Sequence, residues 1–337
     1  MTNPILAARP VPPKPAGSKP LTRNPWFAYA GRRLGHFVVS VIVLVTAAFL
    51  MVQLIPGDPA QASAGPNAPA ELVEQRREEL GLNLPLWLQY LQFWRGLFTG
   101  DLGESIALRI PVTDVMASRL PATLELAGLA VGVVLVVAIP SGLIAGALTR
   151  GGRRRGVELA YTSSTGVLAV IPEFLLGVVL VYLFSVSSQL LPVAGRSGPA
   201  SYVLPVAALA IGSAAALSRI VRAETLTVLD NDYVRTARAK RMPAWRLYLK
   251  HVLPNLMTST LTIAGLLLGG MIAGTVLVEN IFAWPGLGMT IVQSIQGKDY
   301  PLVQVIVIFY GAVILLINLL IDIILILIDP RSALKEG

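Results

Sequence analysis

Six long runs of apolar residues constrain this chain more strongly than any other feature of its sequence. About 20 apolar residues, at 1.5 Å per residue, form a helix that crosses a hydrocarbon core about 30 Å thick. The runs cover residues 34–55, 124–148, 159–187, 202–217, 252–278 and 302–328. Only 14% of the 337 residues are charged, whereas an average soluble domain has about 25%. We therefore expect an all-α integral membrane protein with six transmembrane helices.

Two of these runs differ from a simple span. The run 159–187 is longer than a span needs and contains Pro172, which lacks a backbone N–H and is expected to kink the helix. The run 202–217 is short for a span and follows Pro199. We expect one kinked helix and one short helix among the six.

Positive charge divides the connecting segments into two groups. Four segments hold 20 of the 27 Lys and Arg residues: 1–33, 149–157, 219–251 and 329–337. The other seven lie in three segments: 56–121, 188–201 and 280–301. Because loops rich in Lys and Arg stay in the cytoplasm, we expect a multi-pass protein of a bacterial plasma membrane with both termini cytoplasmic. The net charge of +8 follows from this topology and is split among short segments, so we do not expect nucleic-acid binding.

Two regions outside the spans have a distinct composition. Residues 1–31 are rich in proline and are expected to be a disordered cytoplasmic tail, followed by a transmembrane domain over 32–337. The extracytoplasmic region 56–121 predicts a helix over 70–80, opened by Pro69 with Asn67 as its cap. A second amphipathic segment there carries Trp87, Tyr90 and Trp94, which suit a membrane surface.

Several kinds of chemistry are absent from the sequence. There is no cysteine, no phosphate-binding Gly-x-x-x-x-Gly-Lys-Ser/Thr run and no His-Glu-x-x-His run. The two histidines, His36 and His251, lie far apart along the chain. We therefore expect no catalytic residues, no metal site and no cofactor bound by this chain.

Five acidic residues lie within or near the spans, where a charge costs several kcal/mol and faces a cavity or a partner. Glu125, Glu158 and Glu279 are predicted at span ends, within reach of water. Glu173 and Asp322 are predicted to lie deep, either as partners between helices or as residues of a transport pathway.

A basic, alanine-rich loop lies between the fourth and fifth runs. Asp230 or Asp232 can cap a short helix that begins near Tyr233, and arginines recur every three residues up to Arg241. Pro243 ends this helix, and a second helix is expected over 244–253. The loop suits either docking to a soluble partner or contact with anionic lipid.

The basic loop, with His251-Val252-Leu253-Pro254-Asn255 after it, resembles the EAA loop of bacterial ABC importer permeases. The resemblance is to the dipeptide/oligopeptide branch, and within it to the first-permease, B-type, subunit. Other stretches agree in order: PGDPA at 56–60, GDLGES at 100–105, RLPATLE at 119–125, ENIFAWPGLG at 279–288, DYPLVQ at 299–304 and DPR at 329–331. The match covers about residues 30–332. Arg241 stands where the family has glycine, whose backbone turns freely.

The resemblance implies an ABC importer type I permease fold that moves di- or oligopeptides into the cytoplasm by alternating access. Nickel and glutathione importers share the pattern and are alternative functions. Implied partners are a second paralogous permease, two cytoplasmic ATPases that bind ATP and Mg²⁺, an extracytoplasmic binding protein and membrane lipid. The implied residues of the cytoplasmic coupling helix are Asp232, Tyr233, Arg235, Thr236, Ala237, Arg238, Ala239, Lys240 and Arg241. A proton-coupled secondary peptide carrier is the alternative from another class, and it does not need such a loop.

Aromatic side chains mark the loop 280–289 on the predicted outer side. Phe282 and Trp284 are expected either to meet the binding protein or its cargo, or to anchor the loop at the lipid interface. In the first case Glu279 offers a carboxylate to a peptide amino group. The predicted residues of the substrate pathway or of binding-protein contact are therefore Glu173, Glu279, Phe282, Trp284 and Asp322.

Overall fold

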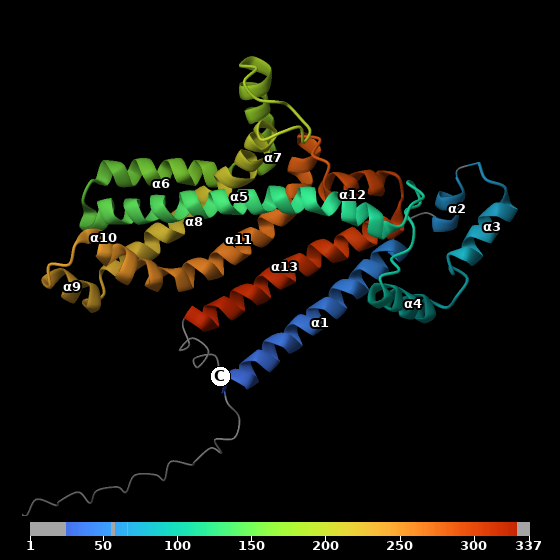
Figure 1. Ribbon diagram of the computed structural model, residues 1–337, viewed down its shortest axis with the longest axis horizontal. Helices are drawn as coiled ribbons and strands as arrows, with labels where there is room; N and C mark the ends of the chain where they lie inside the picture. The colour runs from blue at the N-terminus through green and yellow to red at the C-terminus, as the bar shows by residue number, and fades with distance from the viewer. Residues whose placement is uncertain (1–24, 55–57, 66, 329–337) are drawn as a thin grey trace, which may run out of the picture.

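The computed structural model describes residues 25–54, 58–65 and 67–328, and the regular elements in these ranges are helical (Figure 1). The α-helices are α1 (Pro25–Leu54), α2 (Pro59–Ala64), α3 (Ala70–Glu79), α4 (Leu86–Thr99), α5 (Val112–Thr149), α6 (Arg155–Val170), α7 (Glu173–Leu180), α8 (Ala200–Leu229), α9 (Asp232–Ala239), α10 (Ala244–Leu247), α11 (Leu253–Ile281), α12 (Leu287–Gln296) and α13 (Tyr300–Ile328). Two π-helical segments, Val181–Ser187 and Tyr248–Val252, extend α7 and join α10 to α11. Most of the predicted tail 1–31 and the stretch DPR lie outside the described residues, and α1 begins at Pro25.

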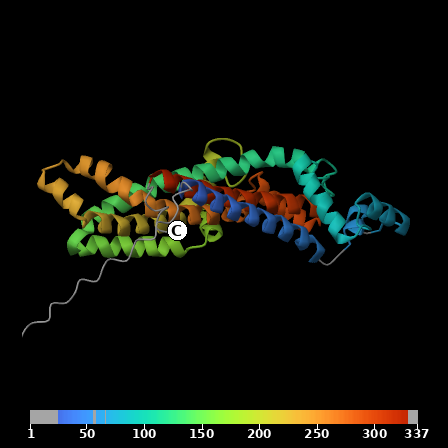
Figure 2. The same ribbon diagram turned by 90° about the horizontal axis from the view of Figure 1, so that it is seen from below.

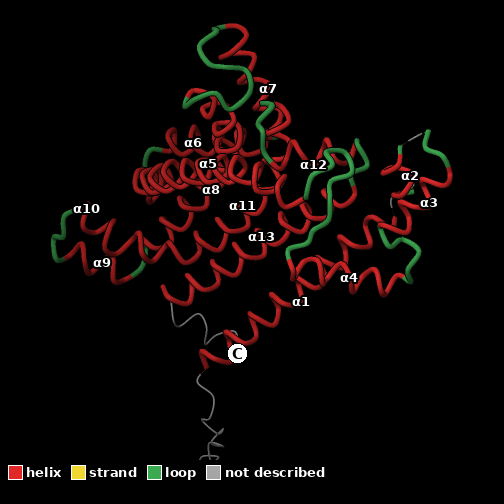
Figure 3. The backbone as a smooth tube through the Cα atoms, turned by 45° about the vertical axis from the view of Figure 1, so that its right-hand side comes forward, coloured by secondary structure: helices red, strands yellow, loops and turns green. Residues whose placement is uncertain are grey.

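Five helices of the described chain are long and apolar enough to span a membrane, and a bent pair makes a sixth. The bent pair is Arg155–Val170 with Glu173–Ser187, and its halves meet at 97°. Figure 3 shows α7 turning away from the line of α6. Ile171, the residue before Pro172, has extended backbone angles, as the proline ring requires. The predicted break at Pro172 is therefore confirmed, and it is a sharp turn between two helices.

The prediction of a short fourth helix is wrong. Helix α8 has 30 residues and continues past Leu217 to Leu229, through Arg219 and Arg222. Hydropathy falls at the first charged residue, but the helix continues because Arg222 finds partners on its neighbours. Its guanidinium donates to Glu158 of α6 at 2.6 Å and to the Thr149 hydroxyl at 3.2 Å. The loop predicted over 219–251 thus begins inside α8.

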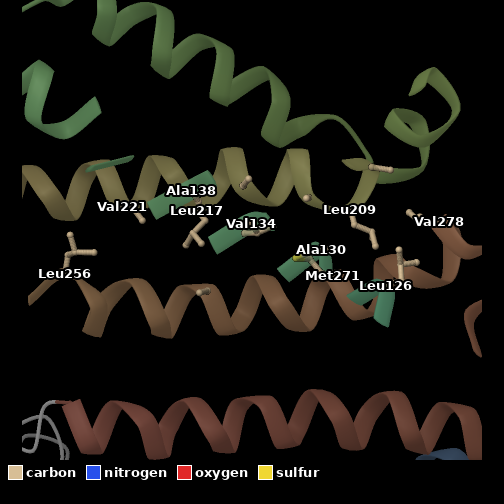
Figure 4. Close-up of a cluster of buried hydrophobic side chains, with 14 of the residues drawn as sticks. Leu126, Ala130, Val134, Ala138, Leu209, Leu217, Val221, Leu256, Met271 and Val278 are labelled. Carbon is tan, nitrogen blue, oxygen red and sulfur yellow. The ribbon is translucent and has the colours of Figure 1, made fainter. Parts of the chain in front are cut away.

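The main core lies where α5, α8 and α11 meet (Figure 4). Along α5 the buried side chains recur every four residues, which places them on one face: Leu126, Ala130, Val134 and Ala138. They meet α8 residues such as Leu209, Leu217 and Val221 in one cluster of buried side chains. Beyond this stretch α5 presents Gly142 and Gly146 to α8, and a Cβ on Gly142 would lie 2.6 Å from Val221 Cβ. Glycine here lets the two backbones approach closely.

The helices outside this core form two further groups. Helices α1 and α13 lie side by side (Figures 1 and 2), and Arg33 pairs with Asp322 at 3.2 Å. A smaller core joins the start of α5 to α12 and α13 through Val112, Leu287 and Ile306. Helices α9 and α10 lie at one end of the molecule and α2 and α3 at the other; we call these the α9 end and the α3 end (Figure 1).

At the α3 end, short helices rest on α1. The Tyr90 hydroxyl of α4 hydrogen-bonds Thr46 of α1 at 2.7 Å, and its ring packs edge-on to Phe49. Helix α3 begins after Pro69 without a side-chain cap, so the predicted cap at Asn67 is wrong. Asp58 instead caps α2 and pairs with Arg77 of α3.

The close contact between α5 and α8 can be tested by a substitution that adds one methyl group at Gly142. We expect Gly142→Ala to lower the free energy of unfolding by about 1–3 kcal/mol, because the added Cβ forces the helices apart. Thermal unfolding of the purified chain in detergent measures this loss. Gly132→Ala, on the same helix with nothing within 4 Å of an added Cβ, is the matched control. Equal melting temperatures for the two variants would contradict the packing argument.

Candidate functional site

Helix α9 is the short helix predicted in the basic loop, but its cap differs from the prediction. It covers Asp232–Ala239, and the N-cap residue is Asn231, in extended conformation and with no side-chain cap bond. Asp232 lies in the first turn, where a negative charge suits the helix dipole. Asp230 instead accepts hydrogen bonds from Arg150 at 2.9 and 3.1 Å.

Two faces of α9 have different surroundings. Val234 and Ala237 are buried and belong to the main core. The other predicted coupling residues are exposed: Asp232, Tyr233, Arg235, Thr236, Arg238, Ala239, Lys240 and Arg241. Ala237 therefore cannot face a partner, contrary to the prediction, and it holds the helix on the body of the protein. The exposed face carries four basic side chains and one acidic side chain.

The turn after α9 takes the left-handed geometry that usually favours glycine. Arg241 has φ of 52°. Its N–H donates to the Arg238 carbonyl at 2.9 Å, and the Met242 N–H reaches back to the Ala237 carbonyl at 3.3 Å. This pair of bonds is the Schellman arrangement that closes many helices. Arginine here keeps the turn of a glycine and adds an exposed cation.

The second predicted helix, 244–253, is continuous with α11. Helix α10 passes through the π-helical segment Tyr248–Val252 into Leu253. Leu247 and Val252 are buried, whereas Trp245 and Leu249 are 62% and 58% exposed. The Arg246 guanidinium lies 5.2 Å from the centre of the Trp245 ring. The α9 end thus exposes three large side chains, Tyr233, Trp245 and Leu249, in addition to the basic residues of α9.

Ion pairs link this end to three long helices. Arg150, directly after α5, binds Asp230 between α8 and α9. Arg222 of α8 binds Glu158 of α6, as described above. These two pairs tie the segment that precedes α9 to the end of α5, and α8 to α6.

Glu279 does not lie where water can reach it, contrary to the prediction. It is fully buried at the end of α11. Its carboxylate accepts hydrogen bonds from the Thr123 hydroxyl at 2.6 Å and from the N–H groups of Gly288 and Met289 at 2.7 and 3.1 Å. These bonds join α5, α11 and α12. In this arrangement the carboxylate is not available to a peptide amino group.

Phe282 and Trp284 are buried as well, so neither lies at a lipid interface or an open pore mouth. The Trp284 Nε1–H donates to the Ala122 carbonyl at 2.9 Å, and the Tyr202 ring packs edge-on against the indole. The Phe282 carbonyl accepts from the Gly195 N–H at 2.8 Å. The loop 280–289 is therefore packed inside the protein, where it joins α5 and α8 to the end of α11.

Glu173, one of the two acidic residues predicted to lie deep, borders an open groove. It is the first residue of α7, directly after the break at Pro172. The groove has a volume of about 570 Å³, and its lining also includes Ser213 of α8 and Met271 of α11. The carboxylate lies against Gly274, where a Cβ would collide with it. Asp322 instead pairs with Arg33, as a partner between helices.

Two polar features of the structure were not singled out in the sequence. Arg219 lines a second groove beside the first; the sequence placed it at the edge of a loop. Asp299 is fully buried and accepts hydrogen bonds from the Ser105 hydroxyl and the Ile106 N–H. Both Asp299 and Ser105 fall within stretches that carry the family resemblance, which is the signal that marks them.

Two family models cover most of the chain. Residues 138–333 match the binding-protein-dependent transport system inner membrane component. Residues 27–127 match the N-terminal part of the membrane component of binding-protein-dependent transport systems.

Similar whole proteins support the same grouping. The glutathione transport system permease protein GsiC of Escherichia coli strain K12 is 36% identical over 308 residues, covering 91% of this chain and 99% of that protein. GsiC of Shigella flexneri serotype 5b has the same identity and coverage.

Among solved structures, the inward-facing MetNI methionine ABC transporter superposes with a TM-score of 0.55 at 18% identity. The match covers 64% of this chain and 97% of that one, and it shows the fold. A second crystal form of the same transporter gives a TM-score of 0.54. With the family models and the relatives, this establishes that the chain belongs to the inner-membrane permease family of binding-protein-dependent ABC importers.

Proposed function

We propose that this permease imports short peptides, glutathione among them, as one half of a heterodimer with a second, paralogous permease. Two ATPase subunits that bind ATP and Mg²⁺ and an extracytoplasmic binding protein complete the proposed transporter. The observation that carries the proposal is the exposed basic face of α9, held on the core by Val234 and Ala237. The similarity to a glutathione transport permease supports the substrate class.

In this proposal α9 is the coupling helix and sits in a groove of an ATPase subunit. Arg235 and Arg238 face the ATPase, with Tyr233 and Trp245 as apolar contacts. ATP-driven closure moves α9, and the pairs Arg150–Asp230 and Arg222–Glu158 carry the motion to α5, α6 and α8. The α9 end and both termini are then cytoplasmic, which agrees with the distribution of Lys and Arg.

A proton-coupled carrier working alone is the competing function, and import of nickel is the competing substrate. A carrier that works alone does not need a docking helix such as α9 for an ATPase. Uptake of labelled trialanine, glutathione and nickel by proteoliposomes with the complete complex separates these functions. We expect peptide uptake that needs internal ATP and survives collapse of the proton gradient. Uptake driven by the proton gradient without ATP, or uptake of nickel alone, would contradict the proposal.

Charge reversal on α9 tests the coupling contact. We expect Arg235→Glu with Arg238→Glu to reduce uptake and stimulated ATP hydrolysis about tenfold or more, because two interfacial cations become repulsive. Arg153→Glu with Arg155→Glu makes the same change in net charge at the same end, off α9, and should have little effect. Both rates are measured on the reconstituted complex. Unchanged uptake and ATPase stimulation in the α9 variant would show that this face does not couple.

Replacement of Arg241 should have opposite effects on the stability of the chain and on its affinity for the ATPase. We expect Arg241→Gly to stabilise the isolated chain by about 1–2 kcal/mol, since glycine adopts positive φ without strain. The same variant should weaken binding of the ATPase by up to about 1 kcal/mol, since it removes an exposed cation. Melting temperature and ATPase affinity give the two values, and Arg241→Lys, which keeps the charge, should retain the affinity. An ATPase affinity that Arg241→Gly leaves unchanged would exclude a contact at Arg241.

A further inference from the structure

Two open grooves run end to end along α8. The first, about 570 Å³, has Glu173 in its wall; the second, about 470 Å³, has Arg219. Ala169 of α6 and Ala216 of α8 line both, so the two grooves adjoin there. We call the pair the α8 groove.

The α8 groove carries opposite charges at its two ends. Glu173 is half-buried and makes no hydrogen bond or ion pair with any other residue that the structure describes. Arg219 is exposed and likewise makes no ion pair within the described ranges. Its neighbour Arg222 is already neutralised by Glu158 at 2.6 Å. One carboxylate and one guanidinium therefore remain for a ligand.

The α8 positions beside the two charges are separated by about the length of a short peptide. Gly212 and Ser213 of α8 line the Glu173 end of the groove, and Arg219 follows six or seven residues later. At 1.5 Å per residue this separation is roughly 10 Å along the helix. An extended tripeptide spans roughly the same length, at up to about 3.5 Å per residue.

The wall between the charges is mostly apolar. Ala169, Gly212, Ala216 and Gly270 lie in it together with larger side chains such as Leu267 and Met271, and its polar residues include Ser213 and Thr162. Such a wall offers mainly apolar contacts to the side chains of a peptide. Recognition in the groove is then left to the two charged ends.

We propose that the α8 groove is a peptide-binding stretch of the translocation pathway, with Glu173 facing the ammonium group and Arg219 facing the carboxylate of the substrate. This proposal rests on the proposed function and adds the residues that select a zwitterionic peptide. The geometry accommodates both a tripeptide and the similar length of glutathione.

The test asks whether each variant slows only those peptides that carry the end group which the replaced side chain should recognise. Complete complexes in proteoliposomes receive saturating loaded binding protein, and initial uptake rates are measured for trialanine, its N-acetyl form and its C-terminal amide. Because only the permease is changed, the preference of the binding protein cancels in the ratio of variant to parent. A charge-assisted hydrogen bond contributes enough for about a tenfold change in rate.

We expect Glu173→Gln to slow trialanine about tenfold and to leave N-acetyl-trialanine within about twofold of the parent. Arg219→Gln should slow trialanine about tenfold and leave the C-terminal amide within about twofold of the parent. Glu224→Gln on α8 and Arg153→Gln near the same end are matched controls outside the groove lining, and they should change no ratio. Gly274→Ala displaces the Glu173 carboxylate and should act in the same direction as Glu173→Gln.

Equal slowing of free and N-acetylated peptide by Glu173→Gln would overturn the assignment. That result is expected if the carboxylate instead pairs with a side chain of the second permease. Unchanged trialanine uptake in both groove variants would overturn it as well. If the parent complex takes up neither trialanine nor glutathione, the proposed function itself fails; if the parent transports and the ratios stay flat, only the α8 groove assignment fails.

Discussion

Where α5 passes α8 at Gly142 and Gly146, two helix backbones approach with no side chain between them on the α5 side. In lipid, the hydrophobic effect does not drive helices together, so such close packing carries much of the association. This contact fixes the position of α8. Helix α8 forms one wall of the α8 groove, and its end leads directly into α9. The proposed pathway and the proposed coupling surface therefore both depend on α8, the groove beside its residues 212–223 and α9 just beyond its end.

Two acidic residues of the long helices, Asp322 and Glu279, are paired inside the protein. Arg33 meets Asp322 between α13 and α1, and Glu279 takes three hydrogen bonds from α5 and α12. An ionisable group without such partners costs several kcal/mol in the hydrocarbon. Glu173 is different: it has an open groove beside it and no partner among the described residues. That contrast separates the acidic residues that hold helices together from Glu173, the one that we propose meets a ligand.

The sequence predicted features that depend on local pattern. Apolar runs located the spans, Pro172 located the break, and the basic loop located α9. The sequence did not predict features that depend on contacts between residues far apart along the chain. Trp284 is buried because its N–H reaches a carbonyl 162 residues away along the chain, at Ala122, and no local pattern records that contact. The full length of α8 was missed for a similar reason, because a hydropathy run ends at Arg219 while the helix continues on pairs with α5 and α6.

The break between α6 and α7 has a consequence for solvent. A helix that stops leaves its last carbonyl groups without partners, and a helix that starts leaves its first N–H groups likewise. Inside a membrane such backbone is tolerated only where protein or a water-filled cavity satisfies it. The Leu168 and Ile171 carbonyls at this break lie next to Gly212 of α8, in the wall of the α8 groove. If the α8 groove serves as proposed, water in it can satisfy these carbonyl groups, and an entering peptide would replace that water along a polar strip of the wall.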